Sequence, residues 1–132
     1  MDGDNEILIE QDGKIVIYSL EEKKCIKTFP ECELEGDFAV SNDKKTMVYE
    51  GKNKHGLCKY SFETGEIEYL SSLSGTAEIT FSKDDNFIIY CDRYFTLTHS
   101  GAAKLYIMDL ASKRKKIIKN YHENIVGGIV CG

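Results

Sequence analysis

Apolar and polar residues alternate along most of this chain in short segments that polar turns separate. The alternation is clear at residues 6–10, and Asp12-Gly13 then has the composition of a tight hairpin turn. No stretch carries the 3.6-residue apolar repeat of a long amphipathic helix. The pattern therefore predicts an all-β fold of short antiparallel strands at residues 6–10, 15–20, 25–29, 38–41, 46–50, 57–62, 67–70, 77–81, 86–91, 104–110 and 115–118.

Two segments match each other without a gap at a separation of 41 residues. Residues 40–49 read VSNDKKTMVY, and residues 81–90 read FSKDDNFIIY. Both run from an apolar residue through Ser and Asp to a pair of apolar residues and a Tyr. The predicted strands at 15–20, 57–62 and 105–110 also align with one another. Self-similarity at such a period indicates a repeat architecture.

Four short antiparallel strands in each unit of roughly 40–45 residues are typical of a β-propeller blade. The second repeat, together with LYIMDL at residues 105–110, resembles the TolB-type, WD-like propeller repeat. That repeat has apolar-Ser-Pro-Asp-Gly before its second strand and Leu-Tyr-x-x-Asp-Leu in its third. Here Asn42 or Lys83 replaces the Pro, and Lys44 or Asp85 replaces the Gly. The resemblance implies a propeller fold and implies no particular activity.

The expected architecture is an incomplete (half) β-propeller of four-stranded antiparallel meanders in one domain. Three blades are predicted at 6–29, 37–70 and 77–119, and a further strand at 125–131. The first blade lacks its innermost strand, and complete propellers have four to eight blades. The chain is then a fragment of a larger propeller, one half of a six-bladed homodimer, or an open half-propeller that a partner covers. The initial Met and the polar start favour an entire small protein.

Charge is distributed unevenly. The formal net charge is −5, and residues 1–37 hold eleven acidic and four basic residues, a net charge of −7. An acidic surface disfavours nucleic acid and favours a basic protein as partner. No apolar run is long enough to cross a membrane, and the acidic N-terminus is unlike a secretory signal. Five cysteines without a CxxC pair suit thiols in a reducing compartment, so we expect a cytoplasmic protein.

No motif in the chain carries a recognisable chemistry. His55, His99 and His122 have no metal-binding spacing, and no G-x-S-x-G nucleophile motif is present. We therefore expect no catalytic residue, no metal and no cofactor. A small hydrolase whose site is assembled across loops, with His55 or His99 as base, is an alternative from another class.

Two segments are candidates for partner binding. The connection at 92–103 is the longest between second and third strands, and long insertions in repeat proteins lie on the binding face. Its candidate contacts are Asp92, Arg93, Tyr94, Phe95 and His99, although the aromatic residues could instead extend the strands. The connection at 30–37 contributes the acidic candidates Glu31, Glu33, Glu35 and Asp37. In a propeller both connections emerge on one face, together with the link at 51–56. The basic run at 113–116 is predicted on the opposite face, as a solvated turn.

These features favour a non-catalytic protein-interaction module. In its narrowest form it would be a stoichiometric inhibitor of the immunity or antitoxin kind, which neutralises a basic toxin such as a nuclease. The first alternative is a fragment of a larger TolB-like or peptidase-associated propeller that acts as a scaffold.

Overall fold

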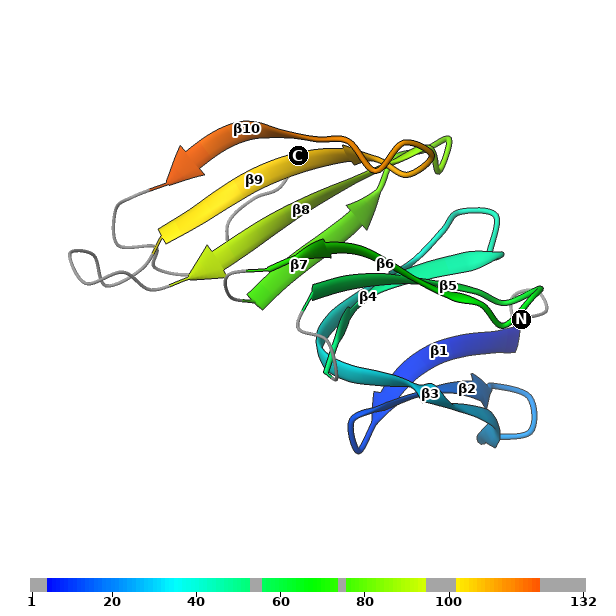
Figure 1. The fold of residues 1–132 in the computed structure, drawn as a ribbon. Coiled ribbons are helices and arrows are strands. Elements are labelled where there is room, and N and C mark those ends of the chain that lie inside the picture. Colours follow the sequence, from blue (N-terminus) through cyan, green and yellow to red (C-terminus); the bar gives the residue numbers. More distant parts are fainter. Residues whose placement is uncertain (1–4, 53–55, 74–75, 95–101, 122–132) are drawn as a thin grey trace.

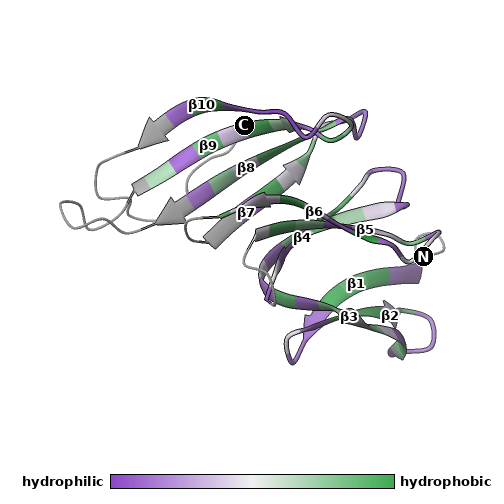
Figure 2. Ribbon diagram, in the orientation of Figure 1, coloured by the Kyte–Doolittle hydropathy of each residue, from purple (hydrophilic) through white to green (hydrophobic). Residues whose placement is uncertain are grey.

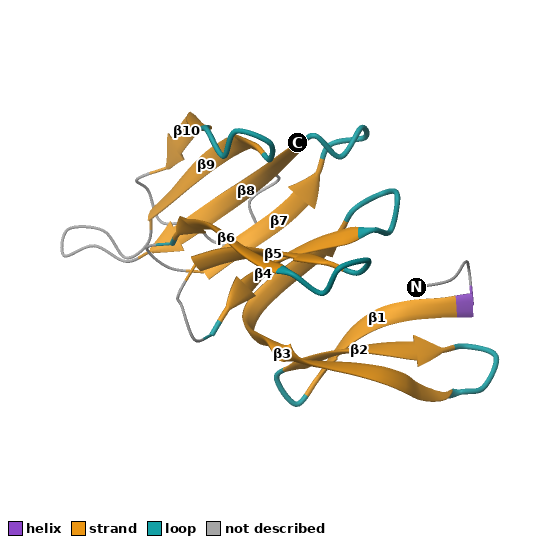
Figure 3. Ribbon diagram, turned by 45° about the vertical axis from the view of Figure 1, so that its right-hand side comes forward, coloured by secondary structure: helices purple, strands orange, loops and turns teal. Residues whose placement is uncertain are grey.

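The computed structural model describes residues 5–52, 56–73, 76–94 and 102–121 of the chain. The described residues form ten strands, so the predicted all-β antiparallel fold is confirmed (Figure 3). The strands are β1 (Glu6–Gln11), β2 (Lys14–Ser19), β3 (Lys24–Val40), β4 (Thr46–Gly51), β5 (Gly56–Ser61), β6 (Ile67–Ser72), β7 (Thr76–Phe81), β8 (Phe87–Tyr94), β9 (Ala102–Asp109) and β10 (Lys115–Tyr121). In this part of the chain no helix is long and apolar enough to cross a membrane. The strand predicted at 125–131 lies outside the described residues.

The strands form two sheets of antiparallel meanders (Figure 1). One sheet has the order β1-β2-β3-β4-β5-β6, and the other has the order β10-β9-β8-β7. We call β1, β2 and residues 24–33 of β3 the first blade. Residues 34–40 of β3 with β4–β6 form the middle blade, and β7–β10 form the third blade. In each blade, strands that follow one another in the sequence also pair with one another, as in a propeller.

Strand β3 differs from the prediction. The sequence suggested two strands, 25–29 and 38–41, joined by an acidic connection, but one strand runs from Lys24 to Val40. Its first part pairs with β2 and its second part pairs with β4. The register of the β2 pairing shifts between Phe29 and Glu33, so Pro30 lies at an irregularity, where a residue without an N–H group is tolerated. The alternation of Glu with Cys32 and Leu34 is itself a strand pattern, and both of those apolar residues are buried.

The core has two layers, one on each side of the middle blade. Between the first and middle blades pack Ile15, Ile17, Phe29, Cys32, Leu34, Met47, Tyr49, Cys58 and Tyr60. Between the middle and third blades pack Val48, Leu57, Leu70, Leu73, Ile79, Ile88, Tyr90, Met108 and Leu110. Successive residues of β4 therefore point into different layers, and the strand is apolar on both faces.

The repeated sequence builds the same turn twice. In the first copy the Ser41 hydroxyl donates to Asp43 Oδ1 at 2.6 Å, and Asp43 Oδ1 also accepts the backbone N–H of Lys45 at 2.9 Å. In the second copy Ser82 donates to Asp84 at 2.7 Å, and the N–H of Asn86 donates to Asp84 at 3.0 Å. These turns need their Ser and Asp, which explains why both residues recur.

The next position in each turn has a left-handed backbone. Lys44 has φ of 61° and Asp85 has φ of 62°. This conformation favours glycine, which explains the Gly of the TolB-type pattern at this place. The predicted turns at Asp12-Gly13 and Gly65 are also left-handed. Asp12 has φ of 54°, Gly13 has φ of 77° and Gly65 has φ of 75°. The turn predictions are therefore confirmed.

Candidate protein-binding surface

The links between strands meet on one side of the first two blades. The backbone N–H of Leu34 donates to the carbonyl of Gly13 at 3.1 Å, and that of Lys52 donates to the carbonyl of Glu33 at 2.9 Å. The β1–β2 turn, the middle of β3 and the end of β4 are thus side by side. We call the surface around Asp12, Gly13, Glu33, Glu35 and Lys52 the link face. The contact between Glu33 and Lys52 agrees with the prediction that the connections at 30–37 and 51–56 emerge together. Most of the connection at 92–103 lies outside the described residues.

The acidic candidates occupy different environments along β3. Glu35 is exposed and Glu33 is half-buried on the link face, and Glu31 belongs to the same strand. Asp37 ties two blades together, because its Oδ2 accepts the backbone N–H of Ile79 in β7 at 3.0 Å. Glu33 and Glu35 are therefore the acidic side chains best placed to meet a partner.

The candidates of the long connection belong mainly to its flanks. Asp92, Arg93 and Tyr94 extend β8, which agrees with the alternative in which this segment lengthens the strands. Asp92 is only 5% exposed, so a partner would not reach it from solvent. Phe95 and His99 lie outside the described residues.

A buried carboxylate that the sequence did not suggest lies behind the link face. Glu50, in β4, is fully buried, and its side chain lies directly over Gly36 of β3. A side chain at position 36 would occupy the space of the Glu50 carboxylate. The signal in the sequence was a Glu inside an otherwise apolar strand, close to a glycine in the neighbouring strand.

The opposite side of the molecule carries the hairpin turns, and we call it the turn face. A shallow depression of about 520 Å³ lies there between the middle and third blades and includes Asp43, Asp84, Asp85 and Asp109. Asp109 Oδ1 accepts the backbone N–H of Ala111 at 2.9 Å, as Asp43 and Asp84 do within their own turns. The hydroxyl of Ser41 lowers the pKa of Asp43, and the N–H of Asn86 lowers that of Asp84. The carboxylates here stabilise the turns.

Asp85 joins the two repeated turns. Its Oδ1 accepts the backbone N–H of Asn42 at 2.7 Å and the side-chain amide of Asn42 at 2.8 Å, and its Oδ2 accepts the N–H of Asp43 at 3.0 Å. The Asn42 amide also donates to the carbonyl of Ser82 at 2.9 Å. We call this contact the clasp. Its two side chains, those of Asn42 and Asp85, are departures from the TolB-type pattern, and a Pro at position 42 would have no backbone N–H to donate.

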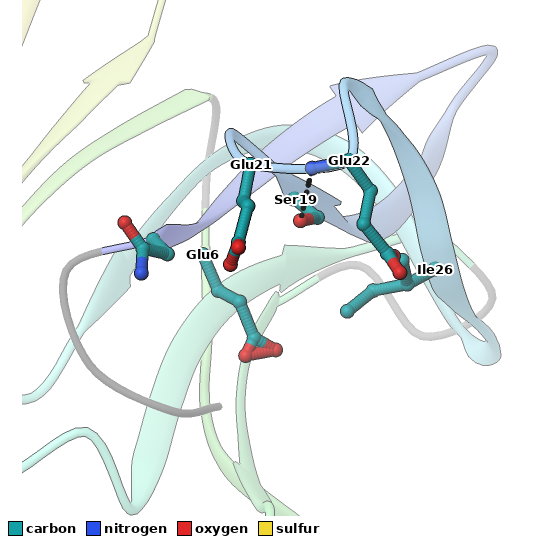
Figure 4. Close-up of a pocket in the computed structure, with 6 residues that line it drawn as sticks. Glu6, Ser19, Glu21, Glu22 and Ile26 are labelled. Carbon is teal, nitrogen blue, oxygen red and sulfur yellow. Dashed lines mark hydrogen bonds between the residues drawn. The ribbon is translucent and has the colours of Figure 1, made fainter.

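A second depression, of about 410 Å³, lies at the turn end of the first blade (Figure 4). It is lined by the acidic residues Glu6, Glu21 and Glu22, together with Asn5, Ser19 and the exposed Ile26. The backbone N–H of Glu22 donates to Ser19 Oγ at 3.0 Å and fixes the turn. Negative charge in the first third of the chain is therefore present at both ends of the first blade.

The basic run has local partners. Lys113 Nζ is 3.4 Å from Glu68 Oε2, and Lys115 Nζ is 2.8 Å from Ser71 Oγ. Lys115 also lies over the ring of Tyr106, at 4.9 Å from its centroid. These contacts favour the interpretation as a solvated turn.

The cysteines differ from the expectation of five thiols. Cys25, Cys32 and Cys58 are free, and the last two are buried beside Tyr49. Burial raises the pKa of the Tyr49 hydroxyl, and the neighbouring Cys32 and Cys58 raise it further. Cys91 is disulfide-bonded, so the expectation is wrong for this residue. Among the described residues no group of His, Cys, Asp and Glu is placed to hold a metal ion, and His55, His99 and His122 lie outside them.

No protein family model and no curated protein sequence matches the chain. Solved structures of β-propeller proteins do resemble it. Oligogalacturonate lyase from Vibrio parahaemolyticus has a TM-score of 0.63 at 18% identity, and the match covers 89% of this chain and 37% of the lyase. TolB from Acinetobacter baumannii has a TM-score of 0.58 at 17% identity, and the match covers 86% of this chain and 29% of TolB. The acylaminoacyl peptidase of Pyrococcus horikoshii has a TM-score of 0.60 at 12% identity, and the match covers 82% of this chain and 20% of the peptidase.

At these identities the comparisons show the fold alone. The fold is that of a β-propeller, as the sequence resemblance implied. The chain spans between a fifth and two fifths of the length of these proteins. It therefore corresponds to a set of blades and not to a whole propeller.

Proposed function

We propose that this chain is a non-catalytic protein-interaction module and that its link face binds a basic protein. The observation that carries the proposal is the convergence of three connections at Glu33, which places Glu33 and Glu35 on an acidic surface beside the β1–β2 turn. Opposite charge on a partner would steer association and raise the rate at which the complex forms.

A narrower form of the proposal is a stoichiometric inhibitor of a basic toxin such as a nuclease. It is supported by the net charge of −7 over residues 1–37 and by the use of the turn-face carboxylates as backbone acceptors. An inhibitor of this kind needs a surface that covers a cationic site, and it needs no reactive group of its own.

The experiment is a capture of the tagged chain from its source cells, first at low and then at high salt. We expect a basic protein to be retained at about 50 mM salt and to be lost at about 500 mM, where charges separated by more than a few ångströms are screened. In the inhibitor form, an equimolar amount of the chain abolishes the activity of the captured protein. Failure to retain any basic protein at low salt would contradict the proposal.

A pair of charge-reversal variants separates the link face from general electrostatic attraction. Glu33→Lys with Glu35→Lys changes the link face, and Glu21→Lys with Glu22→Lys makes the same charge change at the turn end of the first blade. We expect the first pair to weaken binding of the captured protein about tenfold more than the second. Equal losses would assign the attraction to net charge and would remove the link face from the proposal.

The coverage of the solved structures favours a second candidate, a group of blades that serves as a scaffold within a larger propeller. Its test is the mass of the protein in its source cells, measured with an antibody against this chain. A product well above 15.0 kDa supports the scaffold. A product of that mass contradicts it.

A further inference from the structure

One strand position is vacant in the part of the molecule that the structure describes. The same backbone hydrogen bond recurs in every blade, with N–H groups donating to carbonyls from Leu20 to Asn5, from Phe62 to Lys45 and from Leu110 to Asn86. This equivalence aligns β1 with β4 and β8. Each of those two strands pairs with an inner strand, residues 34–40 of β3 or β7, whereas β1 is the last described strand of its sheet (Figure 1). The position beside β1 is therefore that of an inner strand.

The backbone of β1 directs hydrogen-bonding groups into this position. In an antiparallel strand the N–H and C=O groups of successive residues point to opposite sides. Those of Asn5 point to the β2 side, because its carbonyl accepts the N–H of Leu20 at 2.7 Å. By alternation from Asn5, the backbone groups of Leu8 and Glu10 point away from β2 and into the vacant position.

The inner strands of the other two blades show which side chains fit there. They contain Phe38-Ala39-Val40 in the middle blade and Ile79-Thr80-Phe81 in the third, and each trio pairs with the equivalents of Ile9, Leu8 and Ile7. In both trios a small residue stands between two large apolar ones. An occupant in the same register would place a small residue opposite Leu8 and large apolar residues opposite Ile7 and Ile9.

The outer face of β1 is apolar. Leu8 packs against the middle blade, so alternation along the strand places Ile7 and Ile9 on the opposite, outer face. Ile7 is 40% exposed, while its equivalents Met47 and Ile88 are completely buried. Figure 2 shows the apolar residues (green) of β1. Large apolar side chains in the vacant position would lie beside Ile7 and Ile9 and shield them from water.

Both ends of the vacant position are acidic. Glu10 is exposed, and its Oε1 accepts the backbone N–H of Gly13 on the link face at 2.6 Å. At the turn end, Glu6, Glu21 and Glu22 line the depression of Figure 4. Opposite charges across a strand pair are stabilising, so lysine or arginine fits opposite Glu6 and Glu10.

The same charges disfavour two other occupants. Antiparallel pairing of two β1 strands about Leu8 would set Glu6 of each copy opposite Glu10 of the other, and like charges directly opposite are destabilising. A strand like β7 would be repelled as well, because its Glu78 pairs with Cys91, the equivalent of Glu10.

We propose that the vacant position beside β1 binds an extended segment of a basic protein by strand addition. The segment has the order Lys or Arg, large apolar, small, large apolar, Lys or Arg. It runs antiparallel to β1, from the link face to the turn face, and its small residue exchanges both backbone hydrogen bonds with Leu8. This mode of binding rests on the proposed function, in which the partner is basic, and extends the link face along β1.

The probe is a capped synthetic peptide with Lys-Ile-Thr-Phe-Lys at its centre and glycines on both sides. Its binding is followed by NMR titration of the chain, up to about 1 mM peptide, which detects even weak complexes. We expect saturable binding and slower amide exchange at Leu8 and Glu10, with Ile7 and Ile9 as internal controls because their N–H groups point to β2. Absence of binding at millimolar peptide, or changes centred away from β1, overturns the proposal.

N-methylation of the peptide separates strand addition from attraction between charges. A methyl group on the Thr nitrogen removes the donor that is aimed at the Leu8 carbonyl, whereas the nitrogen of the following Phe points away from β1. We expect the first change to weaken binding about tenfold or more, and the second to leave it nearly unchanged. Equal effects of the two methyl groups would overturn strand addition.

Charge is tested on both sides of the contact. A peptide with Glu in place of both lysines should not bind. Glu10→Gln keeps an acceptor for the Gly13 N–H and removes the charge, and it should weaken the lysine peptide about threefold. Glu66→Gln is the matched control, since Glu66 is exposed in the β5–β6 turn and should have no effect. Equal weakening by both variants, or binding of the Glu peptide, would contradict the basic character of the segment.

The peptide results are independent of the capture experiment. A captured protein that needs Glu33 and Glu35, together with a peptide that does not bind, would overturn strand addition alone. Peptide binding without any captured protein would place the failure in the proposed function. Slow exchange of the Leu8 amide before peptide is added would show that the position is already occupied, by a second copy if sedimentation gives twice 15.0 kDa, and would overturn the proposal.

Discussion

In the middle blade β4 buries apolar residues on both faces, whereas β1, at the same place in the first blade, buries them on one. Met47 and Val48 are both inaccessible to solvent, while Ile7 is substantially exposed and Leu8 is partly buried. The two strands have comparable apolar content, so the difference comes from their neighbours. A blade of this repeat is complete only when another blade lies on each side of it.

The largest expected effect comes from truncating the same repeat position in the two blades. Met47→Ala should cost about 2–5 kcal/mol, because it leaves a cavity between two packed sheets. Ile7→Ala should cost less than about 1 kcal/mol, because much of the side chain stays in water. Urea unfolding of the monomer, followed by circular dichroism, measures both. Val48→Ala is the control on the other face of β4 and should resemble Met47→Ala. Equal losses at positions 7 and 47 would contradict the comparison.

The clasp between the repeated turns should have an intermediate effect. Asp85→Gly and Asn42→Pro each restore the TolB-type residue, and each removes hydrogen bonds between the middle and third blades. We expect Asn42→Pro to cost about 1–2 kcal/mol and Asp85→Gly to cost less, because glycine suits the left-handed backbone at position 85. The double variant should cost less than the sum of the two by about 1 kcal/mol.

The measurement for the clasp is a double-mutant cycle by urea unfolding. Lys83→Pro is the matched control, because position 83 occupies the same place in the third blade. It should be close to neutral. Strict additivity of Asn42→Pro and Asp85→Gly would show that the two residues stabilise the molecule independently.

The smallest expected effect is a dependence of stability on acid pH. The pKa values of Asp43 and Asp84 are lowered from 3.8 in the folded chain by hydrogen bonds within their turns. Their contribution to stability is therefore complete above pH 3.8 and is lost as the pH falls below it, through the folded-state pKa. Urea midpoints measured between pH 7 and pH 2 should decline only at the acid end. Asp43→Asn with Asp84→Asn should flatten that decline, and an unchanged slope would contradict the assignment.

Much of the fold was predictable because its signals are local. The Ser and Asp of the repeated turns act within a few residues of one another, and Asp12-Gly13 sets its own hairpin. Strand β3 was misinterpreted because Pro30 and the glutamates resemble a polar connection. The alternation of Cys32 and Leu34 between those glutamates carried the correct information.

The candidate site was predictable only in part, because it depends on contacts between distant segments. The sequence indicated that the connections share a face and that Glu33 and Glu35 belong to it. It could not show that Asp37 is engaged with Ile79 or that Asp92 is buried. The clasp was visible only as two separate departures from the repeat pattern, since its residues are 43 positions apart.

The continuity of β3 has a mechanical consequence. The outermost strand of a blade is normally the first to peel away, but here it continues without interruption into the innermost strand of the next blade. Opening the first blade completely therefore requires the same backbone to leave the middle blade as well. The first six strands should therefore open as one cooperative unit, with slow amide exchange along the whole length of β3.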